Sequence, residues 1–134
     1  MAHLHGETFP HEPWSKDFIG KLLNRQGSLA LLAETNPPQS ILTGFILVQC
    51  AADEAEILTI AVAPDHQRQG IGTKLLDDAI KHLKAMNITH LFLDVSRKNH
   101  PAIALYDHFG FMECGNRPDY YKDGSDGMLM AKSL

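Results

Sequence analysis

The ten residues QRQGIGTKLL, at positions 67–76, constrain the fold more than any other stretch of the chain. The apolar run ILTIAV that precedes them is typical of a strand. After them, apolar side chains recur at helical spacing over about four turns, at Leu75, Leu76, Ala79, Ile80, Leu83 and Met86. Gly70 and Gly72 allow the backbone to bend sharply between strand and helix. This order predicts an anion site, because the N–H groups of a first helical turn lack intrahelical partners.

The other segments predict one mixed α/β domain over residues 1–134. A helix capped by Ser15 ends near Gly27, and three strands at 29–33, 41–50 and 56–62 form an antiparallel meander. A strand at 90–95, a helix that begins at Asn99 and two short strands at 112–115 and 128–131 complete the chain. The strand–helix–strand unit over 57–95 is the expected parallel crossover.

The bulk composition excludes several classes of protein. A net charge of -4 argues against nucleic-acid binding through a broad basic surface. The start of the chain does not resemble a signal peptide, and no apolar run is as long as a membrane span. We therefore expect a cytoplasmic protein that needs no membrane. Cys50 and Cys114 lie far apart in strand-like runs, and we expect both to be buried, reduced thiols.

The N-terminal segment is rich in histidine, at His3, His5 and His11, with Glu12 beside them. The spacing of these residues matches no rigid set of metal ligands, and flexible termini commonly carry histidines. We therefore expect no metal site.

Two common phosphate-binding motifs do not fit the glycine loop. A dinucleotide-binding fingerprint requires a third glycine where Leu75 stands. The phosphate loop of nucleotide triphosphatases requires adjacent glycine and lysine, whereas Thr73 separates Gly72 from Lys74. The spacing that fits is Q/R-x-x-G-x-G/A, although glycines there could also serve only a tight turn.

Two longer runs resemble the GNAT superfamily of N-acetyltransferases. AVAPDHQRQGIG contains its acetyl-CoA signature, and NHPAIALYDHFGF resembles its second conserved run. The resemblance covers about residues 9–131. FPHEPWS and YYKDGSDGMLM further resemble the subgroup of bacterial ribosomal-protein alanine N-acetyltransferases, in which an alanine usually stands where this chain has Gly127.

The resemblance implies a GNAT-like mixed central sheet with flanking helices and acetyl-CoA as the cosubstrate. It implies that a backbone cradle holds the pyrophosphate, formed by Arg68, Gln69, Gly70, Ile71, Gly72 and Thr73. Ile60, Ala61 and Val62 would pair with the pantetheine arm and polarise the thioester carbonyl. Asn99 would contact the cofactor, and it is also a good helix cap.

Acetyl transfer to an amine needs an acid for the leaving thiolate and a base for the ammonium. By resemblance Tyr106 is the acid, although a tyrosine on this helix face could simply belong to the core. Asp94 is the candidate base; the subgroup carries a longer glutamate there, so a water relay would bridge to the amine. Glu56 is the competing candidate for the base. Alternatively, Glu56 is only an exposed charged residue at the end of a strand.

The implied acceptor is the α-amine of a protein N-terminus, plausibly of a ribosomal protein. Alternatives are a lysine or small-amine acetyltransferase of the same fold and a non-catalytic acyl-CoA-binding module. The presence of Asp94, Glu56 and Tyr106 together favours an enzyme. Members of the family usually begin with a strand, which is missing ahead of Ser15 in this sequence. Either one edge of the sheet is uncovered, or the sequence begins after the native N-terminus.

Overall fold

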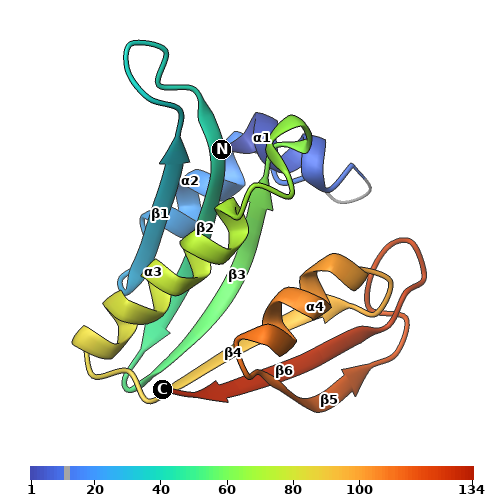
Figure 1. Ribbon diagram of the computed structural model, residues 1–134. Helices are drawn as coiled ribbons and strands as arrows, with labels where there is room; N and C mark the ends of the chain where they lie inside the picture. The colour runs from blue at the N-terminus through green and yellow to red at the C-terminus, as the bar shows by residue number, and fades with distance from the viewer. Residues whose placement is uncertain (11–12) are drawn as a thin grey trace.

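The computed structural model describes residues 1–10 and 13–134 (Figure 1). The helices are α1 (Ala2–Thr8), α2 (Lys16–Leu23), the 3-10 turn η1 (Pro64–His66), α3 (Ile71–Ala85) and α4 (His100–His108). The strands are β1 (Ser28–Glu34), β2 (Leu42–Ala51), β3 (Glu54–Val62), β4 (His90–Ser96), β5 (Met112–Arg117) and β6 (Gly127–Ser133). Every predicted helix and strand is confirmed, and α1 is an element that the sequence did not predict.

The strands form one sheet in the order β1-β2-β3-β4-β6-β5. β1, β2 and β3 are antiparallel neighbours, which confirms the predicted meander. β3 and β4 pair in parallel, so α3 is the crossover helix between them. β6 lies between β4 and β5 and is antiparallel to both.

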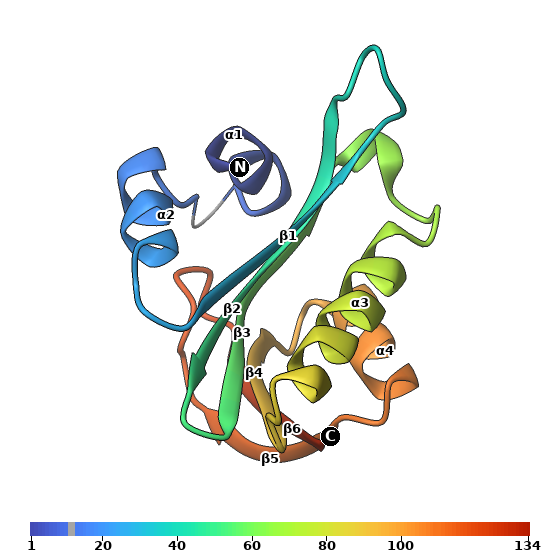
Figure 2. The ribbon, with the colours of Figure 1, turned by 90° about the vertical axis from the view of Figure 1, so that its left-hand side faces the viewer.

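Helices cover both faces of the sheet. Figure 2 shows α3 and α4 on one side of the strands and α1 and α2 on the other. The larger core lies under α3 and α4, where Leu76, Leu83 and Leu91 are fully buried. The smaller core joins Ile19 and Leu22 of α2 to Phe45 of β2. The sheet is therefore sandwiched, as a strand with apolar side chains on both faces requires.

Residues 2–8 form the helix α1, so the interpretation of this part of the N-terminal segment as a flexible terminus was wrong. His5 is 2% exposed, and its Nδ1 accepts a hydrogen bond from the backbone N–H of Trp14 at 3.1 Å. The imidazole also stacks on the Trp14 ring with centroids 4.5 Å apart. His11 and Glu12, which belong to the same histidine-rich segment, lie outside the described residues. Among the described residues ahead of Ser28 none lies in a strand, and β1 forms an edge of the sheet.

Burial lowers the pKa of His5 from 6.5 to about 4, because the charged imidazolium is poorly solvated there. A lowered pKa in the folded state means that the stabilisation is complete above pH 6.5 and declines toward pH 4. We expect the free energy of unfolding to fall by about 2 kcal/mol between pH 7 and pH 5 through this group. His5→Phe retains an aromatic ring but cannot be protonated, so denaturant titrations at the two pH values should show a smaller loss. An unchanged loss would contradict the assignment.

Cys114 corrects the expectation of two buried thiols, because its side chain is exposed whereas Cys50 is partly buried. The pairing of β5 with β6 shifts between Glu113 and Gly115, so Cys114 occupies a β-bulge. A bulge residue has no partner in the ladder and is reoriented relative to its neighbours. Apolar neighbours in the sequence therefore did not indicate burial here.

Candidate active site

The site lies where β3 and β4 separate. The two strands pair from Glu54 to Ile57 and from His90 to Leu93. Immediately beyond this point β3 contains a bulge at Leu58, because Leu47 and Val48 of β2 pair with Thr59 and Ile57. A bulge bends its strand, and Figure 1 shows β3 and β4 diverging from their shared end. Residues 58–62 therefore turn one backbone edge toward the opening.

A cavity of about 770 Å³ fills this opening. Its walls include the glycine loop and α4 on one face of the sheet, and His5, Phe9 and Trp14 on the other. Most of the predicted site residues line it: Ile60, Val62, Arg68, Gly70, Ile71, Gly72, Thr73, Asp94, Asn99 and Tyr106. The structure thus brings together residues from the two motifs that lie about 30 positions apart in the sequence.

Two predicted cofactor residues do not line the cavity. Ala61 is buried in the core beneath α1 and α2, because successive side chains of a strand point to opposite faces. Gln69 is exposed to solvent outside the cavity. For these two residues, side-chain contact with a ligand in the cavity is not supported.

The glycine loop has the geometry of an anion site. Gly70 is the N-cap of α3 with φ +81°, and Arg68 also has a positive φ of 64°. Gln67 holds the loop by donating from Nε2 to the Val62 carbonyl at 3.1 Å. Within the described part of the chain, no side chain caps the start of α3. Its first-turn N–H groups are therefore available to a ligand, and these residues fit a diphosphate.

Asn99 combines the two roles considered for it. Its side chain accepts a hydrogen bond from the N–H of Ala102 at 3.3 Å and so caps α4. It also lines the cavity. The cap is confirmed, and contact with the cofactor stays a prediction.

Tyr106 belongs to the core and borders the cavity at the same time. It is 4% exposed on α4, and its ring packs edge-on against Phe111 with centroids 5.5 Å apart. Burial raises the pKa of the phenol further above neutrality, with a smaller contribution from Tyr121. The hydroxyl is thus protonated at physiological pH and can serve as a proton donor.

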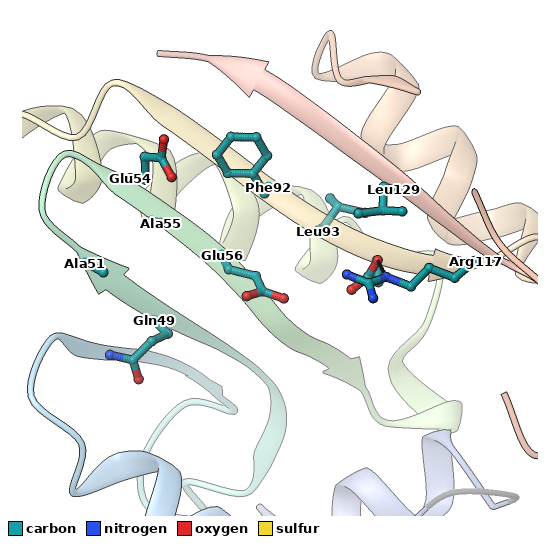
Figure 3. Close-up of a pocket in the computed structure, with 10 residues that line it drawn as sticks. Gln49, Ala51, Glu54, Ala55, Glu56, Phe92, Leu93, Arg117 and Leu129 are labelled. Atoms are coloured by element: carbon teal, nitrogen blue, oxygen red, sulfur yellow. Dashed lines mark hydrogen bonds and ion pairs between the residues drawn. The ribbon is translucent and has the colours of Figure 1, made fainter. Parts of the chain in front are cut away.

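Asp94 stands at the junction of two cavities. A second groove of about 310 Å³ runs along β3 and β4 and is lined by Glu54, Glu56 and Arg117 (Figure 3). Among the described residues Asp94 alone lines both spaces. Of the two candidate bases, the structure places Asp94 but not Glu56 on the cavity that holds Tyr106.

The carboxylates of this groove share one cation. Arg117 donates from Nε to Oδ1 of Asp94 at 3.3 Å. The pKa of Glu56 is raised by burial and by the charge of Asp94, and the charge of Arg117 opposes this increase. Figure 3 shows the side chains of Glu56 and Arg117 extending toward the same part of the groove. The three groups therefore form one electrostatic unit.

Sequence reasoning missed part of the site. Arg117 lies 23 positions from Asp94, and an isolated arginine in a strand gives no signal of that contact. His5 and Phe9 line the cavity from a segment that was expected to be flexible. Trp14 falls within the FPHEPWS run that resembles the acetyltransferase subgroup, and that run was the available signal for this wall.

Two kinds of feature are absent from the described residues. No group of three or more histidine, cysteine, aspartate or glutamate side chains there could hold a metal ion. None of the described helices has both the length and the apolar character needed to cross a membrane.

Comparison with known proteins gives consistent matches. The sequence model of the acetyltransferase (GNAT) family matches residues 1–111. The ribosomal protein bS18-alanine N-acetyltransferase of Escherichia coli K12 is 42% identical over 134 residues, which are 97% of this chain and 88% of the relative. The crystal structure of the ribosomal-protein-S18-alanine N-acetyltransferase from Escherichia coli aligns with a TM-score of 0.90 and 33% identity, covering 99% of this chain and 84% of that one. A GNAT acetyltransferase from Elizabethkingia anophelis, solved with acetyl-CoA bound, aligns with a TM-score of 0.80 and 26% identity over 98% and 89% of the two chains.

Proposed function

Because the chain belongs to the GNAT family of acetyltransferases and uses acetyl-CoA to acetylate an amine, we propose that its acceptor is a protein N-terminus. The α-amine of a ribosomal protein is the first choice, since the similar Escherichia coli enzyme is named for alanine acetylation of ribosomal protein bS18. The observation that supports this best is the cavity itself. It passes between β3 and β4 and joins the glycine loop to the opposite face of the sheet. Such an acceptor places the reaction in the cytoplasm.

The two faces of the cavity take different substrates in this proposal. Arg68 and the first-turn N–H groups of α3 bind the pyrophosphate on one face. The free edge of β3 over residues 58–62 offers backbone N–H and C=O groups to an extended pantetheine arm. The acceptor enters from the other face, beside Trp14 and Asp94. Attack then occurs in a ternary complex within the opening between the strands.

The proton transfers follow from the same arrangement. Asp94 removes a proton from the acceptor ammonium through a water molecule, since its side chain is short. The amine nitrogen then bonds to the carbonyl carbon, and the carbon–sulfur bond breaks as the tetrahedral intermediate collapses. Tyr106 donates its hydroxyl proton to the departing thiolate, because the phenol is protonated and borders the cavity. The nitrogen loses its second proton through water, which restores the Tyr106 hydroxyl and leaves a neutral amide, and Asp94 releases its proton to solvent.

An acetylation assay with three classes of acceptor tests this function. The acceptors are peptides with a free N-terminal alanine, N-terminally blocked peptides with an internal lysine, and small primary amines. We expect the free α-amine peptides to give the highest kcat/KM. A preference for lysine or small amines would overturn the proposed acceptor. Stabilisation by acetyl-CoA without transfer to any acceptor would instead indicate a binding module.

Gly70 provides a test of the pyrophosphate site. The variant Gly70→Val places a β-branched residue at φ +81°, which we expect to cost about 1–2 kcal/mol of stability. Distortion of the loop should also weaken acetyl-CoA binding by more than about tenfold. Thermal unfolding with and without acetyl-CoA measures both effects, because a bound ligand raises the midpoint.

Gly110→Val is the matched control for this test. Gly110 has a φ of +88°, and a Cβ atom there would meet only the end of the flexible Lys132 side chain, at 3.4 Å. It follows α4 and does not line the cavity. The control should lose similar stability and retain acetyl-CoA binding. Equal loss of binding in both variants would contradict the assignment of the loop.

A further inference from the structure

We propose that Arg117 is a positioning residue, which holds the Asp94 carboxylate at the junction of the two cavities, and that Tyr120 and Gly127 hold Arg117 in place. The inference rests on the proposed role of Asp94 as base. In this arrangement a cation from one strand orients a short carboxylate on another strand. The register of three strands, two side-chain contacts and one close backbone approach support it.

The register of the sheet places Arg117 and Asp94 on the same face. Arg117 pairs with Gly127 of β6, and Gly127 pairs with Ser96 of β4. Asp94 lies two residues before Ser96 on β4, and residues two apart on a strand share a face. Arg117 thus reaches across β6 from β5, and its Nε lies 3.3 Å from Oδ1 of Asp94.

The aromatic ring of Tyr120 packs against the guanidinium group of Arg117. The guanidinium carbon of Arg117 lies 5.2 Å from the centre of the Tyr120 ring, within the range of a cation–π contact. The ring in turn lies against β6 at Gly127. A Cβ atom on Gly127 would be 3.2 Å from Cδ2 of Tyr120, closer than side chains normally approach. The glycine therefore makes room for the ring on which Arg117 rests.

Asp94 needs such support because of its surroundings. Its side chain has one methylene group and is 18% exposed, so solvent alone does not orient it. Burial and then the charge of Asp94 raise the pKa of the nearby Glu56 carboxyl, so the two carboxylates repel each other when both are charged. The Arg117 guanidinium offsets this repulsion, and its Nε–H group donates to one oxygen of the Asp94 carboxylate. Arg117 itself is about half exposed, so its contribution to overall stability is small.

Other charged or titratable groups line the two spaces that Asp94 borders. Glu54 and Glu56 of β3 and Arg117 of β5 line the groove, while the larger cavity adds groups from α1, α4 and loops: His5, Arg68, Lys98, Tyr106, Tyr121, Lys122 and Asp123. Removal of the charge of Arg117 leaves the groove with carboxylates and no cation among its described lining residues. A change in the pH dependence of Arg117 variants therefore reports on this groove.

The first experiment compares Arg117→Gln and Arg117→Lys in the peptide acetylation assay. We expect Arg117→Gln to lower kcat by about tenfold with a smaller change in KM for acetyl-CoA. The acidic limb of the pH profile of kcat/KM should move to higher pH, because a cation that favours the charged carboxylates is lost. Arg117→Lys should restore the position of the limb and part of the rate. Arg97→Gln is the control, since Arg97 pairs with Glu113 outside both cavities.

A second experiment tests whether Tyr120 and Gly127 hold Arg117 in place and whether Arg117 positions Asp94. Gly127→Ala and Tyr120→Leu should each lower kcat in the same direction as Arg117→Gln, by a smaller factor. In an Asp94→Glu background the longer side chain is expected to bring the carboxylate into the cavity without the contact to Arg117. Arg117→Gln should therefore cost about threefold or less there. An equal cost in both backgrounds would overturn the positioning role.

The outcomes separate this inference from the proposed function. If Asp94→Asn removes activity and Arg117→Gln leaves both kcat and the pH profile unchanged, the inference is wrong and the base assignment stands. If Asp94→Asn remains fully active, both are wrong. A readout independent of the acceptor is the NMR titration of the Glu56 carboxyl carbon, which should move to higher pH in Arg117→Gln. An unchanged Glu56 titration would contradict the electrostatic interaction between Arg117 and the carboxylates of the groove.

Discussion

Replacement of Tyr106 by phenylalanine is expected to lower kcat by about 100-fold, because the variant loses the hydroxyl that protonates the leaving thiolate. The ring itself remains, and its packing against Phe111 in the core is preserved. Binding of acetyl-CoA should therefore be unchanged. Steady-state kinetics with a saturating peptide acceptor measures the loss, and thermal unfolding with acetyl-CoA measures the binding.

The Tyr106 result discriminates between a catalytic and a purely structural residue. A tyrosine that served only the core would lose little on removal of its hydroxyl, since phenylalanine has nearly the same volume. Unchanged turnover in a folded Tyr106→Phe enzyme would thus contradict the acid assignment. A fall in kcat together with a large fall in the unfolding midpoint would instead indicate structural damage.

Asp94→Asn is expected to lower kcat/KM by about 100-fold and to flatten the acidic limb of its pH profile. Asparagine is nearly isosteric with aspartate but cannot accept the proton of the ammonium. Glu56→Gln is the matched variant, because Glu56 shares the groove but does not line the cavity beside Tyr106. It should lower kcat/KM by about threefold or less. The opposite order of the two effects would assign the base to Glu56.

The elements that the sequence predicted are those with a local signal. The spacing of Leu76, Ala79 and Leu83 along α3 repeats over several turns, and all three side chains are buried. The seven residues of α1 have no such repeat and include Gly6, a poor helix former. α1 is instead stabilised by tertiary contacts, among them the stacking of His5 on Trp14. A propensity argument could not predict a helix that depends on partners elsewhere in the chain.

The same distinction applies to the site. The glycine loop was predictable because its residues are contiguous and their backbone geometry is local. The contact between Arg117 and Asp94 depends on the register of β4, β6 and β5, which includes the bulge at Cys114. No pattern within one segment encodes that register. The sequence therefore predicted the wall of the cavity formed by the glycine loop more completely than the walls that contain His5, Phe9 and Trp14.

The bulge at Leu58 has a mechanical consequence for the whole molecule. It divides the sheet into two three-stranded halves, β1-β2-β3 and β4-β6-β5, which are joined by four residue pairs and by the crossover helix α3. In the proposed complex a pantetheine arm lying along residues 58–62 would take the place of the missing length of strand contact. The cosubstrate would then form a temporary seventh strand of the sheet. Each turnover would then stiffen the two halves as the arm enters and loosen them as the product leaves.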